Sequence, residues 1–387
     1  MKITKLFRDF FESEKVGGFI LIICTVISLI LANSIFSKEY LHLWHLPFAG
    51  KPIEYWINDG LMAIFFLLIG LELEREIYSG ELSNLKKASL PIFAALGGMV
   101  VPAGLYLFLN YGTDTQSGAG IPMATDIAFA LGILSLLGNK VPTSLKVFLT
   151  ALAVIDDLGA ILVIAIFYTK NLDFVNLSIA IGIFALLLVL NRLKVRNLIP
   201  YLVLGVVMWY FMLNSGVHAT ITGVLLAFAI PFGNGSKKST SYILQHSLHK
   251  PVTLMILPLF AMANTAIIID SDWHYALTHR YTIGIALGLI IGKPLGISLF
   301  TYLSVKAKLC RLPEDLNWKS IIGVSFLGGI GFTMSIFITL LAFNDLEHIS
   351  HSKIMILLSS IIAAIIGLLF LKSVLKKDYK EEVSNDE

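Results

Sequence analysis

The stretch LTALAVIDDLGAILVIAIF (residues 149–167) carries two adjacent carboxylic acids, Asp156 and Asp157, in an otherwise apolar run. A charged residue at the centre of a membrane helix costs about 2.5–3.5 kcal/mol. Adjacent helical residues point about 100° apart, so one cationic side chain cannot satisfy both acids in a structural ion pair. Because desolvation and mutual repulsion disfavour ionisation, such a pair can exchange protons near neutral pH. The same oxygens are hard ligands for a small cation, so protons and the cation should compete for one site.

Three further polar groups lie in apolar segments that have the length of membrane helices. Asp126 follows Thr125, whose hydroxyl and neighbouring backbone carbonyls would complete a shell for Na⁺ or Li⁺, and Lys293 lies in GLIIGKPLGI. Four charges at mid-helix would cost on the order of 10 kcal/mol, which predicts that function retains them. The alternative for Asp126 and Lys293 is a buried ion pair that only holds helices together.

The elements that must position these residues are membrane helices. The 387 residues are 56% hydrophobic and 14% charged, with a mean hydropathy of +0.81, which indicates a polytopic membrane protein. The apolar runs lack a period of two, which favours helices over a membrane barrel. A window of about 20 residues predicts about twelve spans, centred near residues 26, 67, 98, 129, 156, 182, 206, 225, 260, 293, 331 and 363.

The basic residues predict the orientation. With twelve helices and a cytoplasmic N-terminus, 23 Lys and Arg fall in cytoplasmic segments and five fall outside, as the positive-inside rule requires. Both termini are then cytoplasmic. The first apolar run can be read as a signal peptide, but its length and the poor cleavage site ANS favour a membrane helix. Cys24 and Cys310 show no disulfide, metal or redox spacing, and the scattered basic runs argue against nucleic-acid binding.

We expect a single membrane domain over residues 1–387, with a cytoplasmic N-terminus at 1–15 and a mobile cytoplasmic tail at 375–387. The external connection at 36–56 contains a Gly-Lys turn between short alternating stretches, which is typical either of a β-hairpin or of an irregular loop. No soluble domain interrupts the apolar segments.

Two apolar segments, residues 117–133 and 326–343, are rich in helix breakers. Glycine pairs commonly permit close helix packing. In the first segment, however, Gly118, Gly120 and Pro122 immediately precede Thr125 and Asp126, and the second clusters three glycines up to Gly331. Interrupted helices in corresponding halves of a chain are typical of a transporter site at mid-membrane.

At these residues the sequence resembles the NhaA-type sodium/proton antiporters of bacterial inner membranes, which are themselves an established example of inverted repeats. The resemblance runs from GGFILII near residue 17 to the last helix. The motifs that carry it are WINDGLMAIFFLLIGLELEREI, PMATDIAFALGIL, LTALAVIDDLGAI, SGVHATITGVLLAF, GLIIGKPLGI and GGIGFTMSIFI.

The resemblance implies inverted-topology repeats in which two interrupted helices cross near mid-membrane. It makes Asp157 the principal cation ligand and Asp156 its gating or proton-carrying neighbour, so this pair would hold the transported Na⁺. Asp126 and Lys293 would balance half-helix dipoles, and Lys293 would hold a transportable proton, paired with Asp156 when no cation is bound. More protons than sodium ions would be exchanged, without a resident cofactor.

The family is also switched off at acidic pH and contains dimers. The residues matching positions linked to the pH response are Glu72, Glu76, His218 and Gly331, with His246 and His249 in a loop after the eighth helix. Gln245 departs from the family pattern, because an acidic residue is expected there. Residues 45–58 resemble the family's homodimer contact.

Three alternatives to antiport make different demands on the sequence. A sodium-coupled symporter of the same fold needs a roomy polar pocket for an organic solute. An intramembrane aspartyl protease needs its two acids on separate helices in Gly-x-Gly-Asp and Tyr-Asp contexts, whereas these are adjacent. A passive channel is disfavoured because titratable acids at a helix break would trap a cation.

Overall fold

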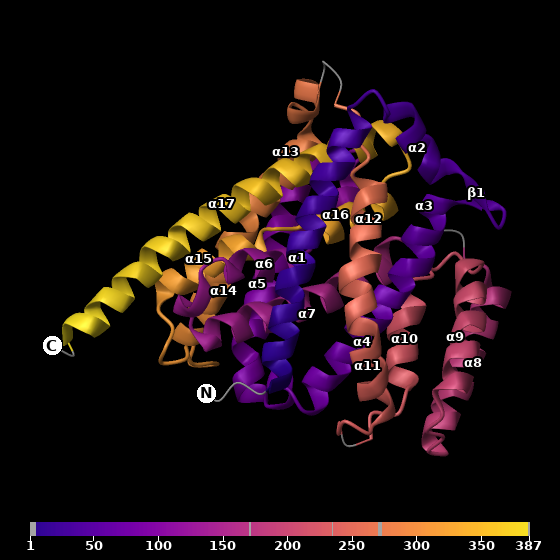
Figure 1. Cartoon of the computed structure of the whole chain (residues 1–387), viewed down its shortest axis with the longest axis horizontal. Coiled ribbons are helices and arrows are strands. Elements are labelled where there is room, and N and C mark those ends of the chain that lie inside the picture. Colours follow the sequence, from indigo (N-terminus) through magenta and orange to yellow (C-terminus); the bar gives the residue numbers. More distant parts are fainter. Residues whose placement is uncertain (1–4, 170–171, 234, 270–272, 386–387) are drawn as a thin grey trace. The chain divides into compact units, whose positions relative to one another are not determined.

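The chain is built almost entirely of helices (Figure 1). The computed structural model describes residues 5–169, 172–233, 235–269 and 273–385. The α-helices are α1 (Lys5–Ala32), α2 (Ser37–His45), α3 (Ile53–Tyr55), α4 (Met62–Tyr78), α5 (Leu85–Asn110), α6 (Ile127–Ser135), α7 (Thr143–Phe167), α8 (Phe174–Arg192), α9 (Leu198–Leu213), α10 (Ile221–Ala229), α11 (Thr240–Pro251), α12 (Leu257–Asn264), α13 (Arg280–Leu287), α14 (Lys293–Lys306), α15 (Trp318–Gly328), α16 (Phe332–Ala342) and α17 (Leu346–Asn385). Shorter 3₁₀ and π-helical turns are η1 (Trp56–Leu61), η2 (Glu81–Ser83), η3 (Gln116–Met123), η4 (Gly138–Lys140), η5 (Val252–Ile256), η6 (Trp273–Leu277) and η7 (Gly288–Gly292).

The helices confirm an all-α polytopic membrane protein. Among the described residues, eight helices are long and apolar enough to cross a membrane, and the pair α15–α16 makes a ninth, bent by 46°. Of the other predicted spans, those centred near residues 206 and 225 are helices of 16 and 9 residues. The span near residue 260 is α12, which continues from α11 through η5.

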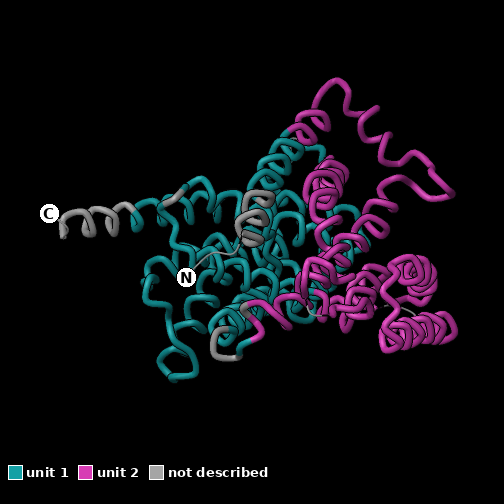
Figure 2. Tube along the Cα trace, turned by 60° about the horizontal axis from the view of Figure 1, so that its bottom comes forward, with its two compact units in different colours: residues 1–26, 84–160, 267–387 teal, residues 27–83, 161–266 magenta. Residues whose placement is uncertain are grey.

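The chain folds into two compact units made of interleaved segments (Figure 2). Unit 1 contains residues 1–26, 84–160 and 267–387, and unit 2 contains residues 27–83 and 161–266. All the residues predicted to bind the cation or to balance dipoles belong to unit 1. Glu72, Glu76 and His218 belong to unit 2.

Unit 1 contains both of the predicted helix interruptions, and they touch. The chain leaves η3 at Met123 and is extended at Asp126 (φ −85°, ψ 100°) before α6 begins. Gly329, Ile330 and Gly331 separate α15 from α16. The Asp126 N–H donates to the Ile330 carbonyl over 2.7 Å, which confirms that the two interrupted segments cross.

A contact between glycines places Lys293 beside α7. A Cβ at Gly97 of α5 would lie 2.2 Å from the Gly296 carbonyl of α14, and a Cβ at Gly296 would lie 2.1 Å from the Gly97 carbonyl. Only hydrogen at both positions permits this backbone approach. Lys293 lies one turn before Gly296 and directly follows the π-helical turn η7, a type of irregularity that is frequent at functional sites.

The connection at residues 36–56 holds α2 and a minimal hairpin. Strands β1 (Pro47–Phe48) and β2 (Lys51–Pro52) pair antiparallel, with Pro47 opposite Pro52. The turn residues Ala49 and Gly50 have φ values of 48° and 81°, the left-handed backbone that two-residue hairpin turns require.

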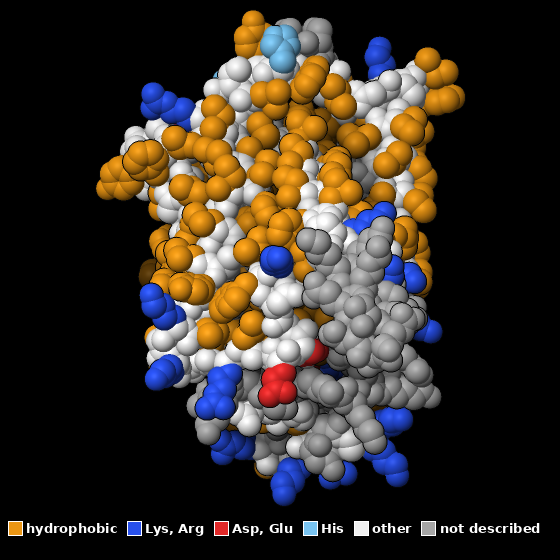
Figure 3. Space-filling view, turned by 90° about the vertical axis from the view of Figure 1, so that its left-hand side faces the viewer, with side chains coloured by type: hydrophobic (Ala, Val, Ile, Leu, Met, Phe, Trp, Pro, Cys, Tyr) orange, Lys and Arg blue, Asp and Glu red, His pale blue; other side chains and the backbone are white. Residues whose placement is uncertain are grey.

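The last helix and the apolar surface agree with the hydrophobic composition of the chain. Helix α17 extends through most of the expected tail, whose residues 386–387 lie outside the described part, as do residues 1–4. Figure 3 shows a face covered largely by hydrophobic side chains, with most of the visible Lys and Arg in the lower part of the view and a few near the upper end. This separation suits helices that cross lipid and end in water.

The contact between Gly97 and Gly296 can be tested by substitution. Gly296→Ala places a methyl group against backbone, so α14 must move away from α5, at a cost of about 1–3 kcal/mol for overpacking. The melting temperature in detergent should fall. Gly104→Ala on α5 is the control, because its Cβ would meet nothing within 4 Å. Equal melting of the two variants would exclude the contact as a determinant of helix position.

Candidate functional site

The centre of the site is a buried ion pair between α7 and α14. The Lys293 ammonium donates to Asp156 Oδ2 over 2.7 Å and also to the Thr125 hydroxyl. Thr125, Asp156 and Lys293 are each at most 1% exposed. Since neither charge has water to solvate it, each is stabilised mainly by the other and by the Thr125 hydroxyl.

Thr125 joins this ion pair to the helix break. Its Oγ1 lies 2.7 Å from Asp156 Oδ2 and 2.9 Å from the Gly328 carbonyl, and it can donate to either acceptor. A hydroxyl has one proton, so the second acceptor must be satisfied by another donor or by a cation. The other carboxylate oxygen, Asp156 Oδ1, accepts no hydrogen bond from any residue that the structure describes and faces Gly98 of α5.

Asp157 is the next residue of α7 and is 1% exposed. Its carboxylate is near enough to interact electrostatically with Lys293. The structure therefore brings Thr125, Asp156, Asp157 and Lys293 together, which supplies hydroxyl, carbonyl and carboxylate oxygens around one ammonium. An oxygen set of this kind suits a hard monovalent cation as well as a proton.

Asp126 does not pair with Lys293, so the alternative of a structural ion pair between these two residues is wrong. Its Oδ1 accepts the Phe129 N–H over 2.9 Å and caps α6. Its Oδ2 accepts the Thr333 N–H over 3.1 Å and also the Thr333 hydroxyl, in the first turn of α16. One carboxylate thus satisfies donors at two helix N-termini, where the helix dipole favours negative charge.

Three polar residues around the breaks were missed by sequence reasoning. Thr333 bonds Asp126, the Ser335 hydroxyl donates to the Ile121 carbonyl over 2.7 Å, and the Ser360 hydroxyl accepts the Phe332 N–H over 3.2 Å. Thr333 and Ser335 directly follow the glycine cluster, which is a usable signal. Ser360 in α17 has no such local signal, because only the tertiary fold brings it to the break.

The residues expected in the pH response have different neighbours within their own units. Glu72 lies 3.5 Å from His249 Nδ1 in unit 2, with both side chains largely buried. Glu76 pairs with Arg75 over 3.2 Å. Gly331 precedes α16 in unit 1 and contacts Ser335 instead.

His218 precedes α10 and lies away from Glu72. Helices α4 and α10 run in the same direction, because Gly223 meets Ala63 and Gly70 meets Ala227. Glu72 follows this contact and His218 comes before it.

The expectation that His246 and His249 lie in a loop is wrong, because both belong to α11. Gln245 on the same helix is 7% exposed. The His246 ring stacks on Tyr242 at a centroid distance of 6.0 Å, which accounts for one of these histidines as a packing residue.

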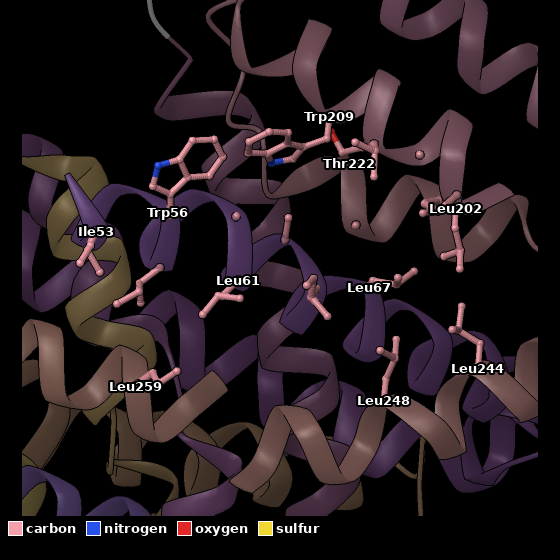
Figure 4. A pocket seen from close by; sticks show the side chains of 18 of the residues that line it. Ile53, Trp56, Leu61, Leu67, Leu202, Trp209, Thr222, Leu244, Leu248 and Leu259 are labelled. Atoms are coloured by element: carbon pink, nitrogen blue, oxygen red, sulfur yellow. The ribbon is translucent and has the colours of Figure 1, made fainter. Parts of the chain in front are cut away.

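Unit 2 also contains an apolar cavity of about 810 Å³ between α4, α9, α10 and α11 (Figure 4). Trp56 and Trp209 lie side by side at its wall, with ring centroids 6.2 Å apart. Their indole N–H groups donate to backbone carbonyls, so only their ring carbons face the cavity. Among the described residues that line it, only Thr222 carries a hydroxyl. The cavity does not offer the groups that would recognise a polar organic solute.

The family model described as Na⁺/H⁺ antiporter 1 matches residues 8–371. The chain belongs to this family. A protein of Flavobacterium psychrophilum named Na⁺/H⁺ antiporter NhaA is 72% identical, over 97% of this chain and 98% of its own length. A protein of Cytophaga hutchinsonii with the same name is 63% identical, over the full length of both chains.

A solved sodium proton antiporter of Methanocaldococcus jannaschii has the same fold as this Na⁺/H⁺ antiporter 1 family member. It matches with a TM-score of 0.51 over 95% of each chain and with 16% identity. At that identity the likeness concerns the helical architecture alone. The membership, together with the apolar helices, makes the chain a multi-pass membrane protein of the antiporter family.

The bond between Asp126 and Thr333 at the crossing can also be tested by substitution. Thr333→Val keeps the shape of the side chain but removes a hydroxyl that bonds a carboxylate, an interaction worth about 1.5–3 kcal/mol. The melting temperature of the detergent-solubilised protein should fall. The matched control on α16 is Thr339→Val, because its hydroxyl bonds only the Ser335 carbonyl of the same helix. If Thr339→Val is as damaging as Thr333→Val, the cap is not what stabilises the crossing.

Proposed function

We propose that the protein is an electrogenic antiporter that expels Na⁺ or Li⁺ in exchange for protons. The observation that carries this proposal is the buried Asp156–Lys293 pair at the crossing of two broken helices, with Asp157 beside it. Family membership and the names of the relatives support the same substrates.

The ion pair supplies a physical reason for protons and the cation to compete for the site. Lys293 and a bound cation both need the oxygens of Asp156 and Thr125, and two positive charges cannot share them in a buried site. A cation that binds Asp157 and Asp156 therefore displaces the ammonium. A buried ammonium that loses its counter-ion is unstable and gives up its proton.

Two protons then leave for each cation that enters. One comes from Lys293 and the other from Asp157, whose carboxylate must be ionised to bind the cation. Release of two positive charges for one makes each cycle move net charge. Asp156 acts as the gate, because it binds either Lys293 or the cation.

Alternating access requires that the site open to each side of the membrane in turn. At the site η3 and α15 end, and α6 and α16 begin. The backbone N–H and C=O groups at these helix ends therefore lie on both sides of the crossing. Asp126 holds the two N-termini together while Thr125 and Lys293 hold the other side. Movement of these half-helices would change which side reaches Asp157.

We place the protein in the bacterial inner membrane with both termini in the cytoplasm, on the basis of the 23 to 5 division of basic residues. We also propose activity at alkaline pH, with Glu72, Glu76, His218 and Gly331 in the response. The buried Glu72–His249 contact supports this for Glu72, because a histidine titrates near neutral pH.

The hairpin is proposed as the contact of a homodimer through residues 45–58. Phe48 at its end is 65% exposed, an apolar side chain that a second copy would cover. The mass of the solubilised protein with and without residues 47–52 tests this; an unchanged mass would reject it.

The function is tested by proton flux in inverted membrane vesicles with a preset proton gradient. Adding Na⁺ or Li⁺ should collapse the gradient above neutral pH, and K⁺ should do little. Asp157→Asn should abolish the response while the protein stays folded, because the amide cannot be ionised. Asp173→Asn is the matched control, since it changes an exposed helix cap that Asn also provides. The absence of a Na⁺ response across pH 6–9, or full exchange by Asp157→Asn, would refute the proposal.

The gate is tested by a double-mutant comparison. Removing one partner of a buried ion pair costs about 3–5 kcal/mol, because the other charge stays buried. Lys293→Met should therefore melt well below the native protein, whereas Lys293→Met combined with Asp156→Asn should recover most of the loss. Both should lack Na⁺-driven flux. If the double variant melts no higher than the single one, Lys293 is not stabilised chiefly by Asp156.

A further inference from the structure

A second cluster of titratable side chains lies in unit 1, outside the transport site. His279 precedes α13, and Glu347 and His351 lie in the first turns of α17. One ligand atom from each of the three residues lies within 4.8 Å of the others. The cluster thus joins the beginnings of two membrane helices, where an aqueous ion can reach it.

The geometry of the cluster is set by the helices. Glu347 and His351 are four residues apart and share one face of α17, with 4.0 Å between Glu347 Oε1 and His351 Nδ1. The His279 ring stacks on the His351 ring with centroids 5.3 Å apart and planes 19° apart. Two imidazoles and one carboxylate form the ligand set of many open zinc sites.

The neighbouring residues hold these side chains in place. The Tyr281 hydroxyl lies 3.0 Å from His351 Nδ1, and such outer contacts fix the orientation of metal-binding histidines. Asp345 Oδ1 accepts the Glu347 N–H over 2.7 Å and so fixes the first turn of α17. The neighbouring His348 is not one of the three grouped ligands, and its ring packs on Tyr281 and Phe343.

We propose that His279, Glu347 and His351 bind a borderline divalent transition metal, with Zn²⁺ as the representative ion and water in the fourth position. The edge of a zinc tetrahedron is about 3.4 Å, so the ligands must draw together on binding. Glu347, whose side chain is 70% exposed, is free to make this movement. The bound metal would tie the start of α13, which leads through η7 to Lys293, to the start of α17.

This site differs in chemistry from the transport site. Imidazole nitrogens favour Zn²⁺, Ni²⁺ or Co²⁺, whereas the oxygens around Asp157 favour hard cations. Stacked aromatic rings alone would also account for the contact between His279 and His351. Only selective binding of a transition metal separates the two interpretations.

The experiment is a calorimetric titration of the whole detergent-solubilised protein, freed of any histidine tag, with ZnCl₂ at pH 7.5, where histidines are mostly neutral. We expect one Zn²⁺ per chain and a Zn²⁺-dependent rise in melting temperature. Mg²⁺ and Ca²⁺ should produce neither effect.

The variants decide whether this cluster is the site. Glu347→Gln and His279→Phe should each weaken Zn²⁺ binding by about ten-fold or more, while the phenyl ring keeps the stacking. His348→Phe is the matched control on the same turn of α17 and should bind Zn²⁺ as the native protein does. The proposal is overturned if Zn²⁺ does not bind, if Glu347→Gln and His279→Phe bind it with native affinity, or if Mg²⁺ stabilises the protein equally.

Discussion

The structure depends on neutralising charges where water cannot reach them. Lys293 and Asp156 are at most 1% exposed, and each is tolerated because the other is 2.7 Å away. The Gly97–Gly296 contact sets the position of Lys293, and the break before α6 sets the position of Thr125. The interruptions are therefore part of the electrostatics, because a continuous helix would place neither the Thr125 hydroxyl nor the Gly328 carbonyl beside the ion pair.

Asp126 lies beside the partial positive charges at the helix N-termini of the crossing. A broken helix leaves N–H groups without partners, and in an apolar medium each one costs several kcal/mol. A single carboxylate accepts from Phe129 and from Thr333 across the crossing, so its full negative charge meets two helix N-termini. Lys293 lies on the other side of the crossing, where Gly328 presents a carbonyl at the end of α15. This arrangement supports the expectation that the two buried charges balance the helix dipoles of the crossing, each with its own hydrogen-bond partners.

Much of the site could be predicted from the sequence, because a charge in an apolar run is conspicuous by composition alone. Asp156, Asp157 and Lys293, together with the glycine-rich breaks, were found in this way, and the crossing of the breaks is confirmed. The choice of Asp156 over Asp126 as the partner of Lys293 had no signal in spacing alone, because three acids lay in comparable apolar segments. Resemblance to the family supplied it, and the packing of α5 against α14 explains it.

The remaining errors also have physical causes. The sequence predicts a loop where α11 lies because His246, His249 and Lys250 make this segment too polar for a membrane span, yet Ser239 caps the helix and Leu244 is buried. The division into two compact units has no local signal in the sequence, because each unit takes separate parts of the chain. A contact such as Ser360 with Phe332 is likewise set by α17 folding back over the break, and no local pattern encodes it.

In the proposed antiport, the Thr125 hydroxyl would let one set of ligands serve both the ammonium and a cation. It accepts from Lys293, while its single proton must choose between Asp156 and the Gly328 carbonyl. When a cation replaces the ammonium, the same oxygen lone pairs turn to the metal and the proton can turn to the carbonyl. No backbone group needs a new partner, because the hydroxyl only changes the direction in which it donates. In the proposed antiport, the exchange of an ammonium for an alkali ion can therefore occur with the helix crossing intact.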